Sequence, residues 1–364
     1  MRVNRLFLIC FCLAAGAAAT LSAQAPAIQN ADVSVRPLAG GLKPAIENLV
    51  RQSTEPVWIG YSVPMIPGDS TMCCFHGNDR DEGNCCKGCH LEERKGDFSG
   101  TTGPQTVRLE AAREVLVLIR AESGRVDKLR SFSSDCPLDA GGRRVYWLSG
   151  VGAQQSVDYL AELVRGSDWS AGPAKKIADA ALSAIAHHAA AGADSALQGF
   201  LSPQRPHGLR KQTAFWLCSA RGRQGFEAVR KVVRNDKEAR FRKEAMFALS
   251  VSREGEAVDE LIHNARNDAS SQVREQALFW LAQKAGRKAV ATLTEAIERD
   301  PETQVKKQAV FALSQLPKDE GVPLLIQVAR KNSNPTVRKQ AMFWLGQSND
   351  PRALQFFEEV LSAK

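Results

Sequence analysis

One nine-residue segment recurs five times in the C-terminal half of the chain, and its spacing constrains the fold more than any other feature. The copies are LRKQTAFWL from residue 209, FRKEAMFAL from 241, VREQALFWL from 273, VKKQAVFAL from 305 and VRKQAMFWL from 337. The copies follow one another with a constant thirty-two-residue period, and a weaker copy, IADAALSAI, starts one period earlier at 177. A fixed period of this length predicts a solenoid of stacked units.

Each unit contains two helical stretches. The recurring segment is one, and a second stretch follows it, such as AVDELIHNA from 257, whose apolar residues have helical spacing. Loops rich in Asn, Asp, Ser or Pro lie between the pairs and are typical of helix starts. The sequence therefore predicts an α-solenoid of helical hairpins over residues 151–364.

Two features inside the segment predict packing between repeats. The eighth position alternates between large and small side chains, which would interdigitate across repeat boundaries: Trp216, Ala248, Trp280, Ala312 and Trp344. The basic residue at position two follows an acidic or amide residue by six positions in four copies, as in Asp236 and Arg242, whereas Gln204 precedes Arg210 in the first. We expect these basic residues to tie each repeat to the next along the loops.

The pattern V-R-x-x-A-x-x-x-L after an Asn/Asp-rich loop resembles the HEAT-like repeat family, in its short, phycobilisome-lyase-type version. The resemblance covers about residues 153–362. It implies a curved stack of helix pairs that binds other proteins, and it implies no catalysis. The lyase activity of some relatives is not transferred, because no residue here marks a pigment site.

One narrow face of the repeated helix remains for binding. It carries position three, which is Lys except for Glu275, and position seven, which is always Phe. The candidate binding residues are Lys211, Lys243, Lys307, Lys339, Phe215, Phe247, Phe279, Phe311 and Phe343. Stacked, they would form a basic, partly aromatic groove for an acidic or extended protein partner. Alternatively, the Phe side chains fill space between repeats and the Lys side chains are only solvated.

The N-terminus predicts export, and the positive charge lies in the C-terminal half. Residues 203–364 hold 28 Lys and Arg against 19 Asp and Glu, so the net charge of +8 belongs to the solenoid. Residues 1–25 have a basic start, an apolar run and a small-x-small site at Ala23–Ala25, which predicts a secretory signal peptide. We expect a periplasmic or secreted protein with no stable membrane insertion after cleavage and no nucleic-acid partner.

Residues 55–150 are predicted to form a small cysteine-rich β or α+β module, after an N-terminal segment at 26–54. The β-like runs are EPVWIGYSVP, EVLVLIRAES, RVDKLRSFS and RRVYWLSG, with a hairpin turn at Ser123-Gly124. Six cysteines in an exported module favour disulfides: Cys73, Cys74, Cys85, Cys86, Cys89 and Cys136. Cys218 occupies a position that is small in every copy and is predicted to be a free thiol.

Residues 73–90 leave two alternatives open. A c-type haem would use Cys86 and Cys89 as thioether links and His90 as axial ligand, with Met72 or His76 opposite. A zinc site would use Cys73 or Cys74, His76, Cys86 and Cys89.

Enzyme chemistry has little support in the sequence. There is no G-x-S-x-G, H-E-x-x-H or Walker motif, and His187 and His188 are expected on a helix surface without a matching nucleophile. The sequence thus predicts an exported, non-enzymatic protein–protein interaction scaffold without a cofactor. The alternative is a redox or metal protein that uses the solenoid as a docking arm.

Overall fold

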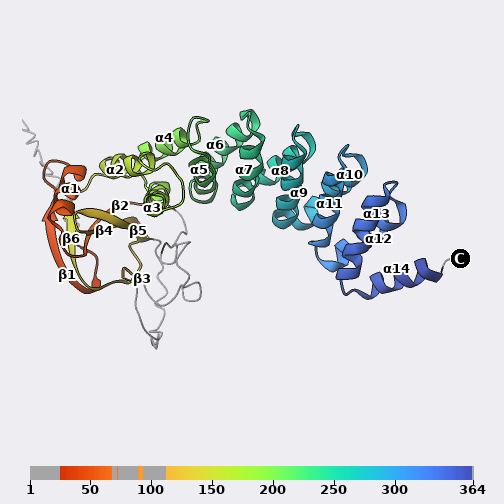
Figure 1. The fold of residues 1–364 in the computed structure, drawn as a ribbon, viewed down its shortest axis with the longest axis horizontal. Coiled ribbons are helices and arrows are strands. Elements are labelled where there is room, and N and C mark those ends of the chain that lie inside the picture. The colour runs from red at the N-terminus through yellow and green to blue at the C-terminus, as the bar shows by residue number, and fades with distance from the viewer. Residues whose placement is uncertain (1–24, 68–71, 73–88, 93–111, 363–364) are drawn as a thin grey trace, which may run out of the picture.

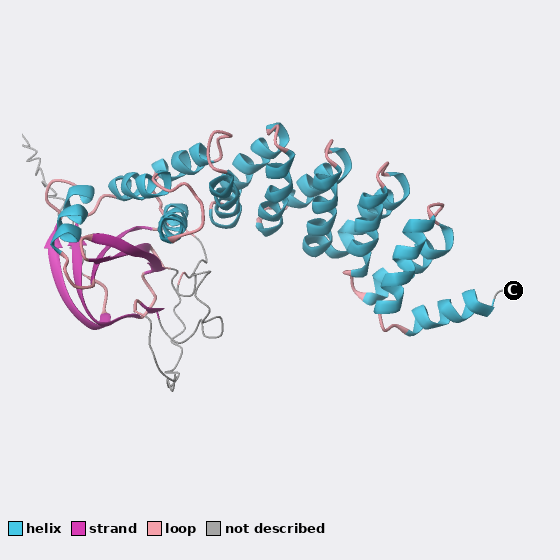
Figure 2. Ribbon diagram, viewed as in Figure 1, coloured by secondary structure: helices cyan, strands magenta, loops and turns pink. Residues whose placement is uncertain are grey.

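The computed structural model describes residues 25–67, 72, 89–92 and 112–362. A small β-sheet near the N-terminus is followed by a row of paired helices that curves toward the C-terminus (Figures 1 and 2). Residues 1–24 of the predicted signal peptide at 1–25 lie outside the described residues. Within the described ranges, no helix is both long enough and apolar enough to cross a membrane.

Six strands form the sheet. They are β1 (Ile28–Pro37), β2 (Val57–Pro64), β3 (Cys89–His90), β4 (Glu114–Glu122), β5 (Arg125–Ser133) and β6 (Leu138–Ser149). Their order is β1-β6-β2-β4-β5, and β3 also pairs with β6. The four β-like runs of the sequence correspond to β2, β4, β5 and β6. The segment at 26–54, for which the sequence predicts no element, adds β1 and the helix α1 (Leu42–Gln52), and β1 pairs with β6 in parallel.

The sheet buries both faces. On one face Ile59, Tyr61 and Val117 pack into a core that is continuous with α1 and with the first helices of the repeat region. On the other face Trp58 and Trp147 belong to a second buried cluster. Gly60 lets the Trp147 indole approach closely, because a Cβ atom at residue 60 would lie 2.8 Å from that ring. Ser123 and Gly124 both have positive φ, which suits a tight two-residue hairpin between β4 and β5.

Helices fill the rest of the chain. They are α2 (Ala153–Arg165), α3 (Pro173–His187), α4 (Ala191–Phe200), α5 (His207–Ala220), α6 (Gly222–Asn235), α7 (Ala239–Val251), α8 (Glu256–Asn267), α9 (Ser271–Ala285), the 3-10 helix η1 (Gly286–Ala289), α10 (Val290–Arg299), α11 (Thr303–Ser314), α12 (Lys318–Lys331), α13 (Pro335–Gln347) and α14 (Pro351–Ser362). We call α5, α7, α9, α11 and α13, which carry the recurring segments, the A helices. Each of them begins just before its copy of the segment.

The A helices pack side by side, each against the next, and the alternate helices pack against them from one side. The resulting core runs unbroken from the sheet through the last repeat. The sheet and the helices also share backbone hydrogen bonds. The Ile66 N–H donates to the His187 carbonyl at 2.9 Å, and the Ala189 N–H donates to the Pro64 carbonyl at 2.9 Å.

Candidate interaction surface on the repeat helices

The seventh-position Phe side chains line up along the stacked A helices and contact one another across repeat boundaries. Phe215 stacks on Phe247 with ring centroids 5.8 Å apart, and Phe279 stacks on Phe311 at 6.1 Å. At the intervening boundaries the Phe ring contacts a Trp ring. The ring centroids of Phe247 and Trp280 are 4.9 Å apart, and those of Phe311 and Trp344 are also 4.9 Å apart. The rings therefore fill space between repeats, in line with one of the two interpretations of the sequence.

Part of this aromatic line still faces solvent. Phe247 is 37% exposed and Phe343 is 54% exposed, whereas Phe215, Phe279 and Phe311 are half-buried. An aromatic ring that is fixed by its neighbours and still half open can pack against another protein at little entropic cost. We call this line, together with the third-position Lys side chains, the A-helix stripe.

The Lys side chains lie one turn before the Phe side chains on the same face of each helix. Lys211 is exposed and its Nζ lies 3.9 Å from a Glu244 carboxylate oxygen, and the Lys307 Nζ donates to the Gln304 side chain at 3.4 Å. Among the described residues, neither Lys243 nor Lys339 makes an ion pair or a side-chain hydrogen bond. Burial raises the pKa of Glu275, the one acidic residue at this position, against the nearby charge of Lys243. The stripe is therefore largely cationic.

The basic residues at position two have a structural role. The Arg242 guanidinium donates twice to Asp268 of the next loop at 2.8 Å and once to the Asp236 carbonyl at 2.8 Å. Arg274 repeats this arrangement one unit later with Asp300 and the Asp268 carbonyl, and Arg210 pairs with Asp236. The predicted tie between repeats is confirmed, but the residue six positions earlier supplies its backbone carbonyl and not its carboxylate.

Two copies lack this tie. In the last copy, Arg338 donates only to the Asn332 and Ser333 carbonyls of its own loop. In the copy before it, Lys306 replaces Arg, and its Nζ donates instead to the Glu298 carbonyl at 2.9 Å. A single ammonium group cannot offer the two parallel N–H groups that a carboxylate accepts from Arg. The arginines of this ladder are engaged within the protein and are not available to a partner.

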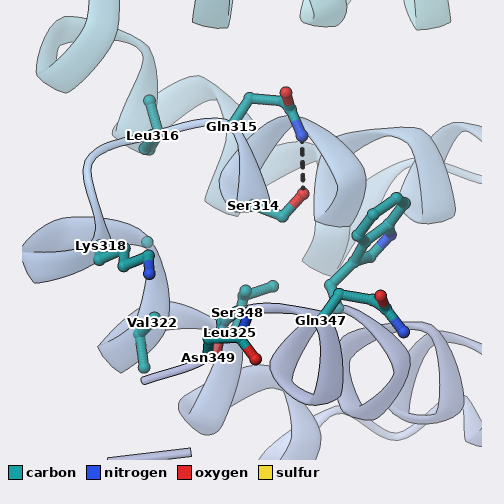
Figure 3. Close-up of a pocket in the computed structure, with 11 residues that line it drawn as sticks. Ser314, Gln315, Leu316, Lys318, Val322, Leu325, Gln347, Ser348 and Asn349 are labelled. Atoms are coloured by element: carbon teal, nitrogen blue, oxygen red, sulfur yellow. Dashed lines mark hydrogen bonds between the residues drawn. The ribbon is translucent and has the colours of Figure 1, made fainter. Parts of the chain in front are cut away.

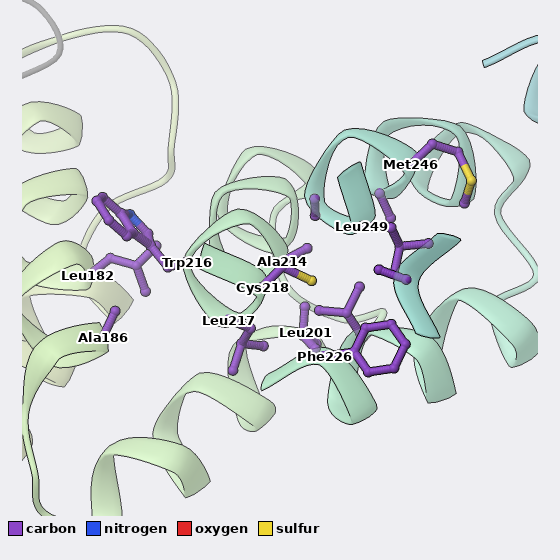
Figure 4. Packing of buried hydrophobic residues seen from close by; sticks show 14 of the residues in the cluster. Leu182, Ala186, Leu201, Ala214, Trp216, Leu217, Cys218, Phe226, Met246 and Leu249 are labelled. Atoms are coloured by element: carbon purple, nitrogen blue, oxygen red, sulfur yellow. The ribbon is translucent and has the colours of Figure 1, made fainter. Parts of the chain in front are cut away.

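Cys218 is a free, buried thiol, as its position in the segment predicts. Figure 4 shows it among apolar side chains that include Leu201, Phe226 and Leu249. Burial raises the pKa of the thiol to about 12, so it is inert at neutral pH.

The cysteine segment lies mostly outside the described residues. Cys73, Cys74, His76, Cys85 and Cys86 belong to the undescribed ranges, and of Cys89 only the backbone, in β3, is described. Cys136 is disulfide-bonded. The His90 Nδ1 lies 3.5 Å from an Asp139 carboxylate oxygen. No group of three or more metal-ligating side chains is found in the part of the chain that the structure describes, so nothing there supports the haem or zinc alternative.

The expectation that His187 and His188 are surface residues is wrong. Both are buried where α3 ends against β2. The Tyr61 hydroxyl lies 2.9 Å from Ser156 Oγ, which lies 2.8 Å from His188 Nε2, and His188 Nδ1 lies 2.6 Å from the Ala184 carbonyl. Because the ring must donate from Nδ1 to that carbonyl, its Nε2 accepts from Ser156.

This Ser–His contact has the distance of a hydrolytic pair, but it is closed to substrate. Ser156 and His188 are both 0% exposed. Burial lowers the pKa of His188 to about 4, which keeps the ring neutral. The network therefore joins the sheet to the helices. The sequence does not reveal it because its members come from β2, α2 and α3, which are distant in sequence.

Comparison with known proteins identifies the last repeats. Residues 290–364 match the family model for HEAT repeats. These residues are similar to HEAT repeats. No curated protein matches the chain in sequence.

Solved structures with similar helical repeats come from proteins of several kinds. Human deoxyhypusine hydroxylase has 17% identity, covers 58% of this chain and 91% of its own, and has a TM-score of 0.30. The phycocyanin lyase complex of CpcE and CpcF from Nostoc sp. PCC7120 has 16% identity, with 57% and 80% covered and a TM-score of 0.28. The karyopherin Kap121p, bound to the extreme C-terminus of the protein phosphatase Cdc14p, has 15% identity, with 54% and 26% covered and a TM-score of 0.35.

The comparison corrects one inference from the sequence. The HEAT-like pattern by itself implies no catalysis, yet a hydroxylase and a lyase are among the proteins with similar repeats. The prediction that the chain is not an enzyme is therefore not supported. These likenesses transfer no activity to it. The match to HEAT repeats supports a protein-interaction scaffold.

Proposed function

We propose that the chain is an exported scaffold that binds a protein partner along the A-helix stripe, and that the partner segment is acidic or extended. The observation that carries the proposal is the composition of the stripe. Half-open aromatic rings alternate with ammonium groups that the protein itself leaves mostly unpaired, whereas its arginines are engaged in the ladder between repeats.

The chemistry of the stripe selects this kind of partner. Carboxylates of a partner would meet Lys243 and Lys339, which lack an ion pair among the described residues. Four of the five fourth-position side chains are Gln, lie beside the stripe and can hydrogen-bond to an extended backbone: Gln212, Gln276, Gln308 and Gln340. The fifth, Glu244, is engaged with His207 at 2.9 Å. The surface repeats with each unit, so a partner without fixed tertiary structure can follow it over several repeats.

Export is part of the proposal and rests on the sequence. The segment at 1–25 has the features of a signal peptide, and the disulfide at Cys136 is of the kind that persists in an oxidising compartment. Cleavage after Ala25 is expected. Intact mass and N-terminal sequencing of protein recovered from outside the cytoplasm test it, and an intact leader on that protein would contradict it.

Charge reversal of the stripe tests the binding surface. Lys211, Lys243, Lys307 and Lys339 are changed together to Glu. The matched control reverses four exposed lysines that lie outside the A helices: Lys231, Lys237, Lys288 and Lys331. Both variants change the net charge equally, so any difference in their partner binding depends on where the lysines lie.

Binding is measured with a fluorescent, unstructured peptide rich in Glu and Phe, and with partners captured from the producing cells. The stripe variant should bind the peptide at least about tenfold more weakly, because four favourable pairs worth a few tenths of a kcal/mol each become repulsive. The control should lose about twofold or less. Equal losses in both variants, or an unchanged set of captured partners in the stripe variant, would remove the stripe from the proposal.

A further inference from the structure

At two repeat boundaries a cationic side chain donates hydrogen bonds to backbone carbonyl groups at the C-terminal end of a helix. The helix is α3 at the first boundary and the A helix α7 at the second. The Arg221 Nη1 donates to the His188 carbonyl at 2.6 Å and to the Ala186 carbonyl at 3.4 Å. The Lys284 Nζ donates to the Ser252 carbonyl at 2.6 Å and to the Ser250 carbonyl at 3.0 Å. The second pair of carbonyls lies two full periods of the repeat after the first, so the two carbonyl pairs are equivalent. The cations come from adjacent positions of the repeat, because Arg221 is equivalent to Ala285 and Lys284 follows Ala220 by two periods.

The next equivalent site lacks its cation. Two further periods along the chain, the equivalent carbonyls are those of Ser314 and Leu316 at the end of α11. The position of Lys284 is then taken by Ser348 and the position of Arg221 by Asn349, so neither position supplies a cation. Among the described residues, no hydrogen bond ends on either carbonyl oxygen.

A pocket of about 270 Å³ occupies this place. Figure 3 shows Ser314, Gln315 and Leu316 on one side of it and Gln347 and Ser348 on the other. The pocket therefore lies at the third of three equivalent boundaries, and the first two are closed by the chain's own cation.

The lining suits an ammonium group on an aliphatic stem. The end of α11 presents the negative end of the helix dipole together with free carbonyl oxygens. Trp344, equivalent to Trp280 and Trp216, offers an indole ring, and Val322 and Leu325 offer apolar surface for methylene groups. Gly321 lets α12 approach the end of α11, because a Cβ atom there would lie 2.5 Å from the Leu313 carbonyl oxygen.

The charged groups around the pocket do not attract a cation. Lys318 forms part of the lining and repels one. Asp350 is already paired with Arg352, whose Nη2 also donates to the Lys318 carbonyl at 2.9 Å. Attraction for a cation must therefore come mainly from the carbonyl oxygens and the indole ring.

We propose that this pocket binds the ammonium group of a lysine side chain on a partner protein. The group would take the place that Lys284 occupies two repeats earlier. Only the assignment to a protein partner rests on the proposed scaffold function, and the ammonium site itself follows from the comparison of the three boundaries. The pocket would add a fixed point of attachment beside the more diffuse stripe.

Nuclear magnetic resonance of the Trp indole N–H groups in the full chain tests this site. The probe is the peptide acetyl-Gly-Lys-Gly-amide, and its controls are the same peptide with an acetylated lysine and n-butylammonium. We expect the Trp344 signal to shift saturably with the lysine peptide, with a Kd on the order of 1 mM for so small a ligand. The neutral peptide should cause no saturable shift, and n-butylammonium should bind more weakly.

Two variants make the test specific. Ser348→Lys supplies the missing cation from within and should weaken peptide binding at least about tenfold without lowering the melting temperature. Lys284→Ser opens the equivalent site and should make the Trp280 signal respond to the peptide. The four-Lys reversal of the stripe should leave the Trp344 response intact, which separates failure of this site from failure of the scaffold function.

Three results would overturn the proposal. The first is an equal response of Trp344 to the neutral peptide, and the second is an unchanged response in Ser348→Lys. The third is binding of n-butylammonium as tight as that of the peptide, which would assign the pocket to small free amines and not to a partner's lysine.

Discussion

Contacts within the sheet join residues that are far apart in the sequence, whereas contacts within the helical repeats join residues that are close. In the sheet, β1 pairs with β6, so Asp32 lies beside Arg144, 112 residues away. In the repeats, Arg242 reaches Asp268, only 26 residues away, and the next unit uses the same contact. The sheet must therefore form as one unit, whereas each repeat depends on its neighbours alone.

This difference determines which part of the molecule can bind a long partner. A surface that repeats with the units can bind a long partner and tolerate local change, because a lost contact affects only adjacent units. The sheet offers no such repetition. Its junction with the helices instead contains a buried polar network, Tyr61–Ser156–His188, in which every member depends on the others.

The largest expected effect comes from the core of the sheet. Trp147→Ala removes a fully buried indole that packs over Gly60 and should cost about 3–5 kcal/mol. Hydrogen exchange should accelerate in all the paired strands together. In the matched variant Trp280→Ala, acceleration should be confined to α7, α8 and α9. Exchange that stays local in the first variant, or spreads through all repeats in the second, would break the comparison.

A smaller, local effect is expected in the ladder. Arg242→Met leaves the Asp268 carboxylate, which is 5% exposed, without its main partner and should cost about 3 kcal/mol. Lys306→Met, at one of the copies without a carboxylate partner, should cost about 1 kcal/mol or less. Thermal unfolding of the two variants measures the difference, and equal losses would show that the Arg–Asp pairs do not hold the repeats together.

The ladder should also weaken in acid. Burial alone would raise the pKa of Asp268, but hydrogen bonds from Arg242 and the Ser270 N–H outweigh it and hold the pKa below its ordinary value. The stabilisation is therefore present above the unfolded-state pKa near 4 and is lost as the pH falls through the lower folded-state value. In Arg242→Met this part of the pH dependence should shrink.

The last expected effect is a pH dependence of stability that comes from the junction between the sheet and the helices. His188 has a pKa of about 4 in the folded chain and near 6.5 when unfolded, so the unfolded chain takes up a proton first as the pH falls. Stability should decrease by about 2–3 kcal/mol between pH 6.5 and 4 and then level off. Tyr61, His187 and Arg221 surround this ring.

Substitution isolates this contribution. His188→Gln should flatten the pH dependence of unfolding between pH 6.5 and 4, whereas His263→Gln, on an exposed helix surface, should leave it unchanged. Unfolding followed by near-ultraviolet circular dichroism at several pH values measures it. An unaltered slope in His188→Gln would mean that the buried ring does not control the junction.

The repeats could be predicted because their signals are local and repeated. The recurring segment predicts the A helices, the small side chain at its tenth position predicts the buried Cys218, and the loop residues predict the ladder. The ladder's true partner lies one repeat away from the predicted one, because the sequence shows spacing within a loop but not which loops stack.

The sheet was only partly predictable. β2, β4 and β6 contain apolar runs, and a Ser-Gly turn lies between β4 and β5; these signals fit within a short stretch of sequence. β1, IQNADVSVRP, is mixed in polarity and acquires its role only by pairing with β6. In the sequence, His187 and His188 look like surface residues of an Ala-rich helix. They are buried because β2, which is distant in sequence, packs against the end of α3. The pocket at Trp344 has no signal in the sequence, because its lining comes together only where α11, α12 and α13 stack.

The most direct test of the binding surface is a lysine-labelling footprint of the complex with a captured partner. If the A-helix stripe is the binding surface, acetylation of Lys211, Lys243, Lys307 and Lys339 should slow several-fold in the complex. Lys231, Lys237, Lys288 and Lys331 should react as in the free chain. Protection of those four control lysines, or of the sheet domain alone, with the stripe lysines still reactive, would contradict the account.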